Sequence, residues 1–341
     1  MAQKSKIEWT DASWNPIVGC SKVSKGCDHC YAIGQAHRLA SNPATPQYHG
    51  LTQITNGRPN WSGKVALVES ALELPLHWKK PKKIFVNSMS DLFHEAVPDE
   101  WIDRTFAVMA LCPQHTFQIL TKRPERMQKY FLAGKRESVL GKAWTILGNP
   151  KFKKYNHSNI TQRIWPLPNV WMGVSVEDQK TADERIPPLL QTPAAVRWVS
   201  YEPALGPVDF SRWLKTPHAD GASCGLLCTK LDWNVCGGES GSGARPMHPH
   251  WARSVRDQCV AAGVPFFFKQ WGAWTAHDVV PGTVKEHSVG PERCVWMHPD
   301  GDVRKIGHGD KRSGDSLLIR VDKKAAGRLL DGREWNQFPT K

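Results

Sequence analysis

Short apolar runs that alternate with helical patterns constrain the fold of this chain more than any other feature of its sequence. Each run is rich in Val, Ile, Phe or Trp and has the length of a buried strand. The runs are Lys83–Val86, Thr116–Leu120, Val170–Val176, Val196–Ser200, Trp233–Cys236 and Pro265–Phe268. The helices expected among them are Asp99–Met109, Pro124–Tyr130, Lys180–Leu190 and His250–Ala262. Because strands that alternate with helices form βαβ units around a parallel sheet, the sequence predicts an α/β fold, as a full or partial (β/α) barrel.

Residues 131–169 interrupt this alternation and form a predicted insertion in the barrel. Aromatic side chains lie among basic ones there, and Glu137 is its only acid. Basic and aromatic residues together are typical of a nucleic-acid contact surface, although a solvated loop has the same composition. The basic residues are Lys135, Arg136, Lys142, Lys151, Lys153, Lys154 and Arg163, and the aromatic ones include Trp144, Phe152, Tyr155 and Trp165.

The pattern changes again near the end of the chain. We expect residues 1–274 to form the barrel, with a cysteine-containing loop near 14–32, and residues 275–341 to form a small appendage. The appendage contains a predicted β-hairpin, whose strands and turn are Cys294–Met297, Val303–Ile306 and Pro299–Asp302.

Polar or charged residues follow nearly every predicted strand at its C-terminal end. In barrels of parallel strands, the active site lies at these C-terminal ends. Because loops are usually polar, one such cluster means little. The inference of an active site rests on the recurrence of polar clusters after successive strands. The strand-end clusters are Asn87–Asp91, Thr121–Arg123, Glu177–Asp178, Tyr201–Pro203, Gly237–Ser240 and Lys269–Trp271.

The charge balance of the chain is basic and favours a polyanionic partner. Lys and Arg number 45 against 32 Asp and Glu, which gives a net charge of +13, and there are 16 tryptophans. Neutralising phosphates releases counterions, so excess positive charge suits nucleic acid, although a soluble protein with a high isoelectric point is the plainer reading. No apolar run approaches the roughly 20 residues that span a bilayer, and the N-terminus lacks the apolar stretch of a signal peptide. We therefore expect a cytoplasmic protein with no membrane partner.

Three clustered cysteines are the strongest chemical signal in the sequence. Cys20, Cys27 and Cys30 follow a C-x6-C-x2-C spacing, and glycines at 19 and 26 give the loop backbone freedom. Three thiolates leave one iron of a [4Fe–4S] cluster without a protein ligand, whereas a closed structural zinc site needs four ligands. Zinc remains an alternative with His29 or a distant cysteine as the fourth ligand, and so does a structural loop with unligated thiols.

The cysteine loop followed by βα units resembles the radical S-adenosylmethionine superfamily. The usual spacing there is C-x3-C-x2-C, and an aromatic residue commonly precedes the third cysteine, where this chain has His29. Over nearly its full length the chain more closely resembles an uncharacterised three-cysteine-motif family found in phages and bacteria. The motifs that carry this resemblance are WNPIVGCSKVSKGCDHCYA, FVNSMSDLFHE, LTKRPER, SYEPALGP, CGGESG, FFFKQWG and AAGRLLDGREWNQFP.

The resemblance implies a (β/α) barrel of the radical S-adenosylmethionine type and a set of site residues. Cys20, Cys27 and Cys30 would ligate a [4Fe–4S] cluster whose open iron chelates S-adenosylmethionine, and an external electron donor would reduce the cluster. The product would be a 5′-deoxyadenosyl radical. Candidate cofactor-binding residues are Asn87, Ser88, Asp91, Ser175, Glu177, Glu202, Gly237, Gly238 and Glu239. Candidate substrate-binding residues are Lys122, Arg123 and Gln270, and candidate catalytic residues are Cys236, Tyr201 and Lys269.

The leading functional hypothesis is a radical enzyme that modifies or repairs a nucleic-acid base or a nucleotide. Its nucleic-acid part rests on net charge, tryptophan content and the basic insertion. A second hypothesis is a non-catalytic nucleic-acid-binding protein whose cysteines hold zinc. A third keeps the radical chemistry and assigns it a protein or small-metabolite substrate.

Overall fold

The structure is a computed structural model that describes residues 3–149, 151, 165–214, 230–276, 290–306 and 311–340. Most of the predicted insertion after position 149, with Lys153, Lys154, Phe152, Tyr155 and Arg163, lies outside the described residues, and so do parts of the predicted appendage. The chain folds as two compact units. Unit 1 comprises Met1–Val174 and Pro187–Arg197, and unit 2 comprises Ser175–Ile186 and Trp198–Lys341.

Unit 1 is built on parallel strands with one antiparallel strand at the edge. β1 (Gln3–Lys4) runs antiparallel to β2 (Ala12–Trp14), and β2 is followed by the parallel neighbours β7 (Lys83–Val86), β8 (Thr116–Thr121) and β9 (Val170–Val176). Ile84, Phe85 and Val86 of β7 are buried, and so is every residue of β9. Continuous burial is expected of parallel strands covered on both faces.

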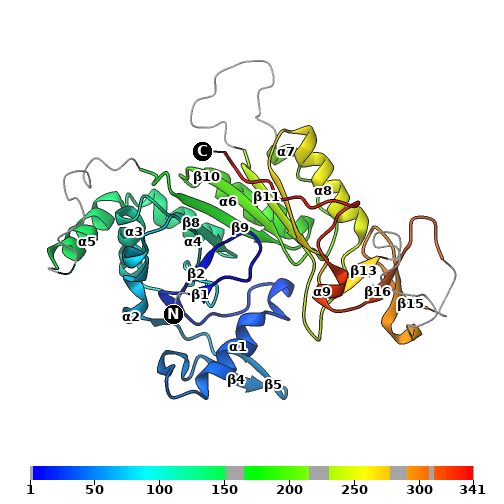
Figure 1. The fold of residues 1–341 in the computed structure, drawn as a ribbon, viewed down its shortest axis with the longest axis horizontal. Helices are drawn as coiled ribbons and strands as arrows, with labels where there is room; N and C mark the ends of the chain where they lie inside the picture. Colours follow the sequence, from blue (N-terminus) through cyan, green and yellow to red (C-terminus); the bar gives the residue numbers. More distant parts are fainter. Residues whose placement is uncertain are drawn as a thin grey trace. The chain divides into compact units, whose positions relative to one another are not determined.

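Three longer helices of unit 1 follow these strands along the chain (Figure 1). α3 is Asp99–Leu111, α4 is Pro124–Leu132 and α5 is Arg136–Gly148. α5 occupies the start of the predicted insertion and packs on α3, with Val139, Leu140, Ala143 and Leu147 buried. The first part of that segment is therefore a helix of the unit core.

Residues 17–77 form a smaller substructure that contains the cysteines. β3 (Ile17–Val18) pairs with β6 (Ala66–Leu67), and the hairpin strands β4 (Thr52–Thr55) and β5 (Arg58–Trp61) pair antiparallel. The cysteine loop contains the 3-10 turn η1 (Lys25–Cys27) and leads into α1 (Tyr31–Ala40). Further short elements are η2 (Pro46–Tyr48), α2 (Glu69–Leu72) and η3 (Leu74–His77).

Unit 2 continues the alternation of parallel strands and helices. β10 (Val196–Tyr201), β11 (Trp233–Gly237) and β12 (Phe266–Gln270) are parallel, and the helices are α6 (Gln179–Gln191), α7 (Ser211–Leu214) and α8 (Pro249–Ala261). Trp198 and Trp233 are fully buried on neighbouring strands, with ring centroids 5.2 Å apart. With β2, β7, β8 and β9 of unit 1, the described residues contain seven strands parallel to a neighbour. The fold is mixed α/β and consistent with a partial (β/α) barrel.

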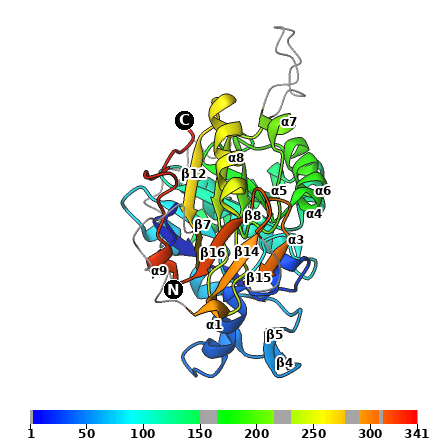
Figure 2. The same ribbon diagram turned by 90° about the vertical axis from the view of Figure 1, so that its right-hand side faces the viewer.

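A four-stranded antiparallel sheet completes unit 2 (Figure 2). Its order is β13 (Trp274–Ala276), β16 (Ser316–Arg320), β14 (Cys294–Met297) and β15 (Val303–Lys305), so the expected hairpin forms, as β14 and β15. After η7 (Pro291–Arg293), this sheet and α9 (Lys323–Ala326), the chain returns to β12. Phe268 donates its backbone N–H to Trp335 O at 2.9 Å. The C-terminal segment thus covers an edge of β12 that is otherwise open.

Candidate functional site

The cysteine loop is fixed to unit 1 by backbone contacts at Gly19. Gly19 has φ +94°, and a Cβ atom there would lie 2.2 Å from Lys64 O, so only glycine fits this position. Its N–H donates to Met89 O at 3.1 Å, and Gly19 forms a β-bridge with Ser90. The loop that follows β7 therefore holds the start of the cysteine loop in place.

The three cysteine thiols gather in this loop. Cys20 follows Gly19, Cys27 ends η1, and Cys30 precedes the first residue of α1. All three are half-buried. Burial is the main cause that raises the pKa of Cys20 to about 12, and nearby Asp91 and the other two thiols raise it further, whereas Arg123 lowers it. Burial also raises the pKa of Cys30, against a lowering influence of Lys122. The thiols are thus close enough to influence one another.

The donor set fits an iron–sulfur cluster in its chemistry. Three thiols lie in one loop, and two cationic side chains lie near them to offset the negative charge of thiolates. Within the part of the chain that the structure describes, no group of three or more His, Cys, Asp or Glu side chains has the arrangement of a formed metal site. Ligation would therefore require the thiols to lose their protons and to close around the metal.

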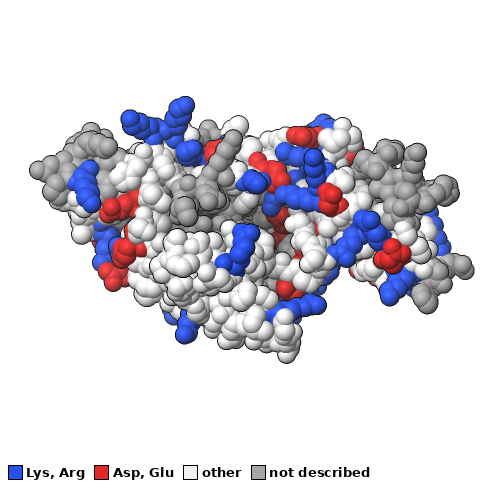
Figure 3. Space-filling view, turned by 60° about the horizontal axis from the view of Figure 1, so that its bottom comes forward, with Lys and Arg blue, Asp and Glu red and all other residues white. Residues whose placement is uncertain are grey.

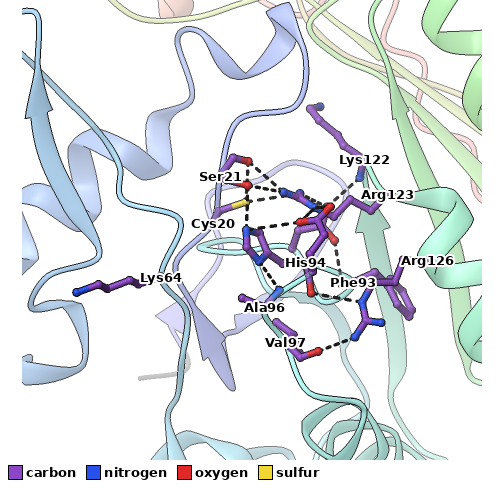
Figure 4. Close-up of polar contacts among 12 residues, drawn as sticks. Cys20, Ser21, Lys64, Phe93, His94, Ala96, Val97, Lys122, Arg123 and Arg126 are labelled. Carbon is purple, nitrogen blue, oxygen red and sulfur yellow. Dashed lines mark hydrogen bonds and ion pairs between the residues drawn. The ribbon is translucent and has the colours of Figure 1, made fainter.

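Arg123 connects the cysteine loop to the ends of β7 and β8 (Figure 4). Its side chain is only 4% exposed, and Nη1 lies 3.9 Å from Cys20 Sγ. Nη2 donates to Ser21 Oγ at 2.8 Å, and Nε donates to both carboxylate oxygens of Glu95 at 2.8 Å. The same guanidinium pairs with Asp91 at 3.2 Å. These contacts hold the cysteine loop against the loops that follow β7 and β8.

Asp91, a predicted cofactor-binding residue, is the anchor of this network. Its carboxylate accepts hydrogen bonds from Thr121 Oγ1 at 2.7 Å, Lys122 N–H at 3.0 Å and Phe93 N–H at 3.0 Å, besides the pair with Arg123. The carboxylate therefore joins the loop after β7 to the end of β8. In Figure 4 the Lys122 side chain points away from the Arg123 guanidinium.

His94 is a second residue, besides Arg123, that forms a hydrogen bond with Ser21 of the cysteine loop. Its Nδ1 accepts the Ala96 N–H at 3.1 Å, so the neutral ring carries its proton on Nε2, which donates to Ser21 Oγ at 2.9 Å. Burial lowers the pKa of His94, and the Arg123 guanidinium lowers it further. His94 is therefore neutral at pH 7 and acts as a hydrogen-bond donor.

Asn87 and Ser88 lie at the base of the same loop. Asn87 has φ +60°, and its Oδ1 accepts the Ile17 N–H at 3.4 Å, while its buried Nδ2 has no hydrogen-bond partner among the described residues. Ser88 Oγ donates to Asn15 Oδ1 at 3.1 Å, and Ser88 O accepts from Tyr31 Oη at 2.8 Å. A buried amide donor without a partner costs about 1–3 kcal/mol, so a bound acceptor at Asn87 would stabilise the site.

Several predicted site residues of unit 2 contact one another. The Lys269 ammonium lies 2.7 and 2.9 Å from the two Glu202 carboxylate oxygens, and Gln270 Nε2 donates to Gly238 O at 2.8 Å. A Cβ atom at Gly238 would lie 2.0 Å from Trp271 O, which explains the glycine. The neighbouring Gly237 lies against Glu202, with 3.3 Å from its ideal Cβ to the carboxyl carbon.

Two further carboxylates of unit 2 are each held by one arginine. Glu239 accepts from Arg245 Nη2 at 2.7 Å and from Nε at 2.9 Å. Glu177 is completely buried and pairs with Arg185 Nη1 at 3.1 Å. Arg185 also donates to the carbonyl of Ser175 at 2.8 Å. The Glu177–Arg185 and Glu239–Arg245 pairs stabilise the chain directly after β9 and β11.

Tyr201 and Cys236, the predicted hydrogen-atom relay, are both enclosed within unit 2. The Tyr201 hydroxyl donates to Gly206 O, and its ring is 1% exposed. Burial is the main cause that raises the pKa of the Cys236 thiol, and Glu202 raises it further. Both groups are protonated at neutral pH and shielded from solvent.

Comparison with known proteins gives a single family. The model of the family described as a protein of unknown function, DUF5131, matches residues 4–339. The chain belongs to the DUF5131 family. No curated protein and no solved structure matches it. Because the match covers nearly the whole chain, both units and the cysteine loop are part of the DUF5131 pattern.

The structure adds functional candidates to this DUF5131 chain that the sequence did not single out. Ser21, His94 and Glu95 complete the network around Arg123, and Asn15 fixes Ser88. His94 and Glu95 fall inside the FVNSMSDLFHE motif, which was the available signal. None of the helices in the described ranges is long and apolar enough to cross a membrane.

Proposed function

We propose that this chain is a radical S-adenosylmethionine enzyme that acts on a nucleic-acid base or a nucleotide. Cys20, Cys27 and Cys30 would ligate a [4Fe–4S] cluster. The observation that carries this proposal is the gathering of three half-buried thiols in one loop, beside the buried guanidinium of Arg123. Three thiolates with a compensating cation suit an iron–sulfur cluster with one iron open to a small ligand.

The cluster, when bound, supplies one electron to the sulfonium of S-adenosylmethionine. The chain supplies the binding site and its orientation. Arg123 offsets the negative charge of the thiolates, and it holds Ser21 and Cys20 against the ends of β7 and β8. Asn87 Nδ2 is the buried donor best suited to an acceptor on the cofactor, because no residue of the described chain uses it. Ser88 is hydrogen-bonded to Asn15 and Tyr31 and fixes the position of the chain directly after β7.

The nucleic-acid part of the proposal rests on charge. The chain carries a net charge of +13. On the face drawn in Figure 3, Lys and Arg side chains stand at several separate places, many of them beside acidic ones. A basic protein of this kind gains affinity for phosphates by counterion release, and a specific site needs only a few well-placed cations.

Adding S-adenosylmethionine to the anaerobically reduced protein is expected to change the electron paramagnetic resonance spectrum of the cluster. An iron without a cysteine ligand would be free to take the amino and carboxylate groups of the cofactor, which would alter its electronic surroundings. Adenosine, which lacks the amino-acid portion, is the control and should leave the spectrum as it was.

Two results would count against the proposal. One is a spectrum that stays the same at saturating S-adenosylmethionine. The other is stoichiometric zinc in place of iron in anaerobically purified protein, since zinc has no redox chemistry to offer.

A further inference from the structure

A polar cleft lies between the cysteine loop and the β4–β5 hairpin of unit 1. Its volume is about 480 Å³, and its lining includes Lys22 and His29 from the loop and Arg58 and Asn60 from the hairpin. Cavities of roughly 300–1,000 Å³ are the usual size for small-ligand sites. Asp28 and His29, which both line the cleft, separate Cys27 from Cys30 in the sequence. The cleft therefore adjoins the loop segment between Cys27 and Cys30.

The hairpin directs one face toward this cleft. In its register Thr55 lies opposite Arg58, and Asn60 is two residues further along the same strand, so these three share a face. All three line the cleft. The other face carries Trp61, which is buried in the core cluster with α1. Pro59 belongs to the Trp61 face and also lines the cleft, so the lining strand residues that share the other face are Thr55, Arg58 and Asn60.

The hairpin is held firmly enough to form one wall of a binding site. Its turn, Asn56-Gly57, has positive φ at both positions, +50° and +70°, which is the geometry of a tight hairpin turn. At the other end, His37 Nδ1 lies 3.1 Å from Thr52 Oγ1. An isolated two-stranded hairpin is marginally stable in water, so these contacts with α1 keep it in place.

The lining chemistry suits a phosphate group. Lys22 and Arg58 are basic, and Thr55, Asn56 and Asn60 add neutral donors, whereas the one carboxylate is Asp28. Phosphate oxygens are acceptors only, and paired cations with amide and hydroxyl donors bind them well. Asp28 and the amide oxygens can accept from sugar hydroxyls or base amino groups, so the cleft suits a whole nucleotide.

The predicted basic insertion is less suited to phosphates in its described part. Lys135 pairs with Asp99 at 2.8 Å, and Lys142 pairs with Glu100 at 2.7 Å, because α5 packs beside α3. The Trp165 ring packs on Phe131, with centroids 5.9 Å apart. Carboxylates from α3 thus neutralise charges that the sequence segment alone leaves uncompensated.

We propose that the cleft between the cysteine loop and the β4–β5 hairpin binds a nucleotide unit of single-stranded nucleic acid through its phosphodiester. This inference rests on the proposed function, since it places the substrate strand beside the loop segment that separates Cys27 from Cys30. A cavity of this size admits one nucleotide of a single strand and is too small for a duplex.

The test is binding of a labelled single-stranded oligonucleotide, as DNA and as RNA, to the cluster-containing protein over a salt series. Lys22→Ala/Arg58→Ala is the cleft variant. Lys79→Ala/Lys80→Ala is the control, since it removes two exposed lysines of the same unit. We expect the cleft variant to bind about tenfold more weakly or worse, with a log–log salt slope smaller by about 1.4. The control should differ little from wild type.

Two outcomes overturn the inference: no wild-type binding at low salt, or equal binding by the cleft variant and the control. Iron content is measured on the same samples and should be unchanged in both variants. Full iron with unaltered binding in the cleft variant would reject the cleft alone. Wild-type protein without iron would reject the proposed function, whatever the binding result.

Discussion

Replacing Cys20, Cys27 or Cys30 with alanine is expected to lower the iron content from about four per chain to near zero. The cluster would be held by three protein ligands, and the loss of any one leaves two thiolates from a half-buried loop. Two ligands do not retain a cluster through purification. The measurement is iron and zinc analysis of anaerobically purified protein for the wild type and each variant.

Cys294→Ala is the matched control for the cysteine variants. Cys294 is a buried thiol of β14 in unit 2, outside the cysteine loop. Its replacement should leave the iron content at the wild-type level. If all three loop variants kept full iron, the assignment of the ligands would be wrong.

Replacing Arg123 with alanine is expected to destabilise unit 1 by about 3–5 kcal/mol. The guanidinium is 4% exposed and its partner Asp91 is 8% exposed at the side chain, so the variant leaves a buried carboxylate without its cation. It also removes the links from Arg123 to Ser21 and Glu95. Urea denaturation of the metal-free protein, followed by circular dichroism, measures the loss.

Arg104→Ala gives the comparison for an exposed ion pair in the same unit. Arg104 lies 2.5 Å from Glu69, with side-chain exposures of 29% and 65%. Its removal should cost about 1 kcal/mol or less, because solvent screens such a pair. Arg123→Lys keeps the charge but not the branched geometry, so its loss of stability should lie between those of Arg123→Ala and Arg104→Ala. Equal stabilities of Arg123→Ala and Arg104→Ala would show that Arg123 does not hold the loop.

The strands of the sheets were predictable because their apolar runs are short, continuous and bounded by polar residues. Lys83–Val86 and Val170–Val176 have the predicted bounds, and α3 extends only two residues beyond its predicted end. Both strands are buried almost throughout, so hydrophobicity alone decides them. The C-terminal hairpin was predictable from its turn residues.

The β4–β5 hairpin and α5 were not predicted, for different physical reasons. Three of the four residues of β4 are exposed, so no apolar alternation marks it, although Asn56-Gly57 is a typical hairpin turn. The helix α5 depends on packing against α3. Its basic residues indicated an exposed segment, although one of its faces is buried. Neither the exposed hairpin nor the packing of α5 on α3 is marked by a local sequence pattern.

The candidate site was predictable in part. The sequence placed Asn87, Ser88 and Asp91 after β7, and the structure brings them to the base of the cysteine loop. It did not predict the bond between Ser21 and His94, which joins positions 73 residues apart. Nor did it predict that Arg123 would be enclosed by carboxylates, since that depends on how three loops meet.

The formation of 5′-deoxyadenosine tests the central claim most directly. Reduced wild-type protein is incubated anaerobically with S-adenosylmethionine, beside the variant in which Cys20, Cys27 and Cys30 are all alanine, and products are quantified by mass spectrometry. We expect wild type to yield methionine and 5′-deoxyadenosine in equal amounts, slowly without substrate, and the triple variant to yield neither. A wild-type protein with an intact, reduced cluster that forms no 5′-deoxyadenosine would contradict the account.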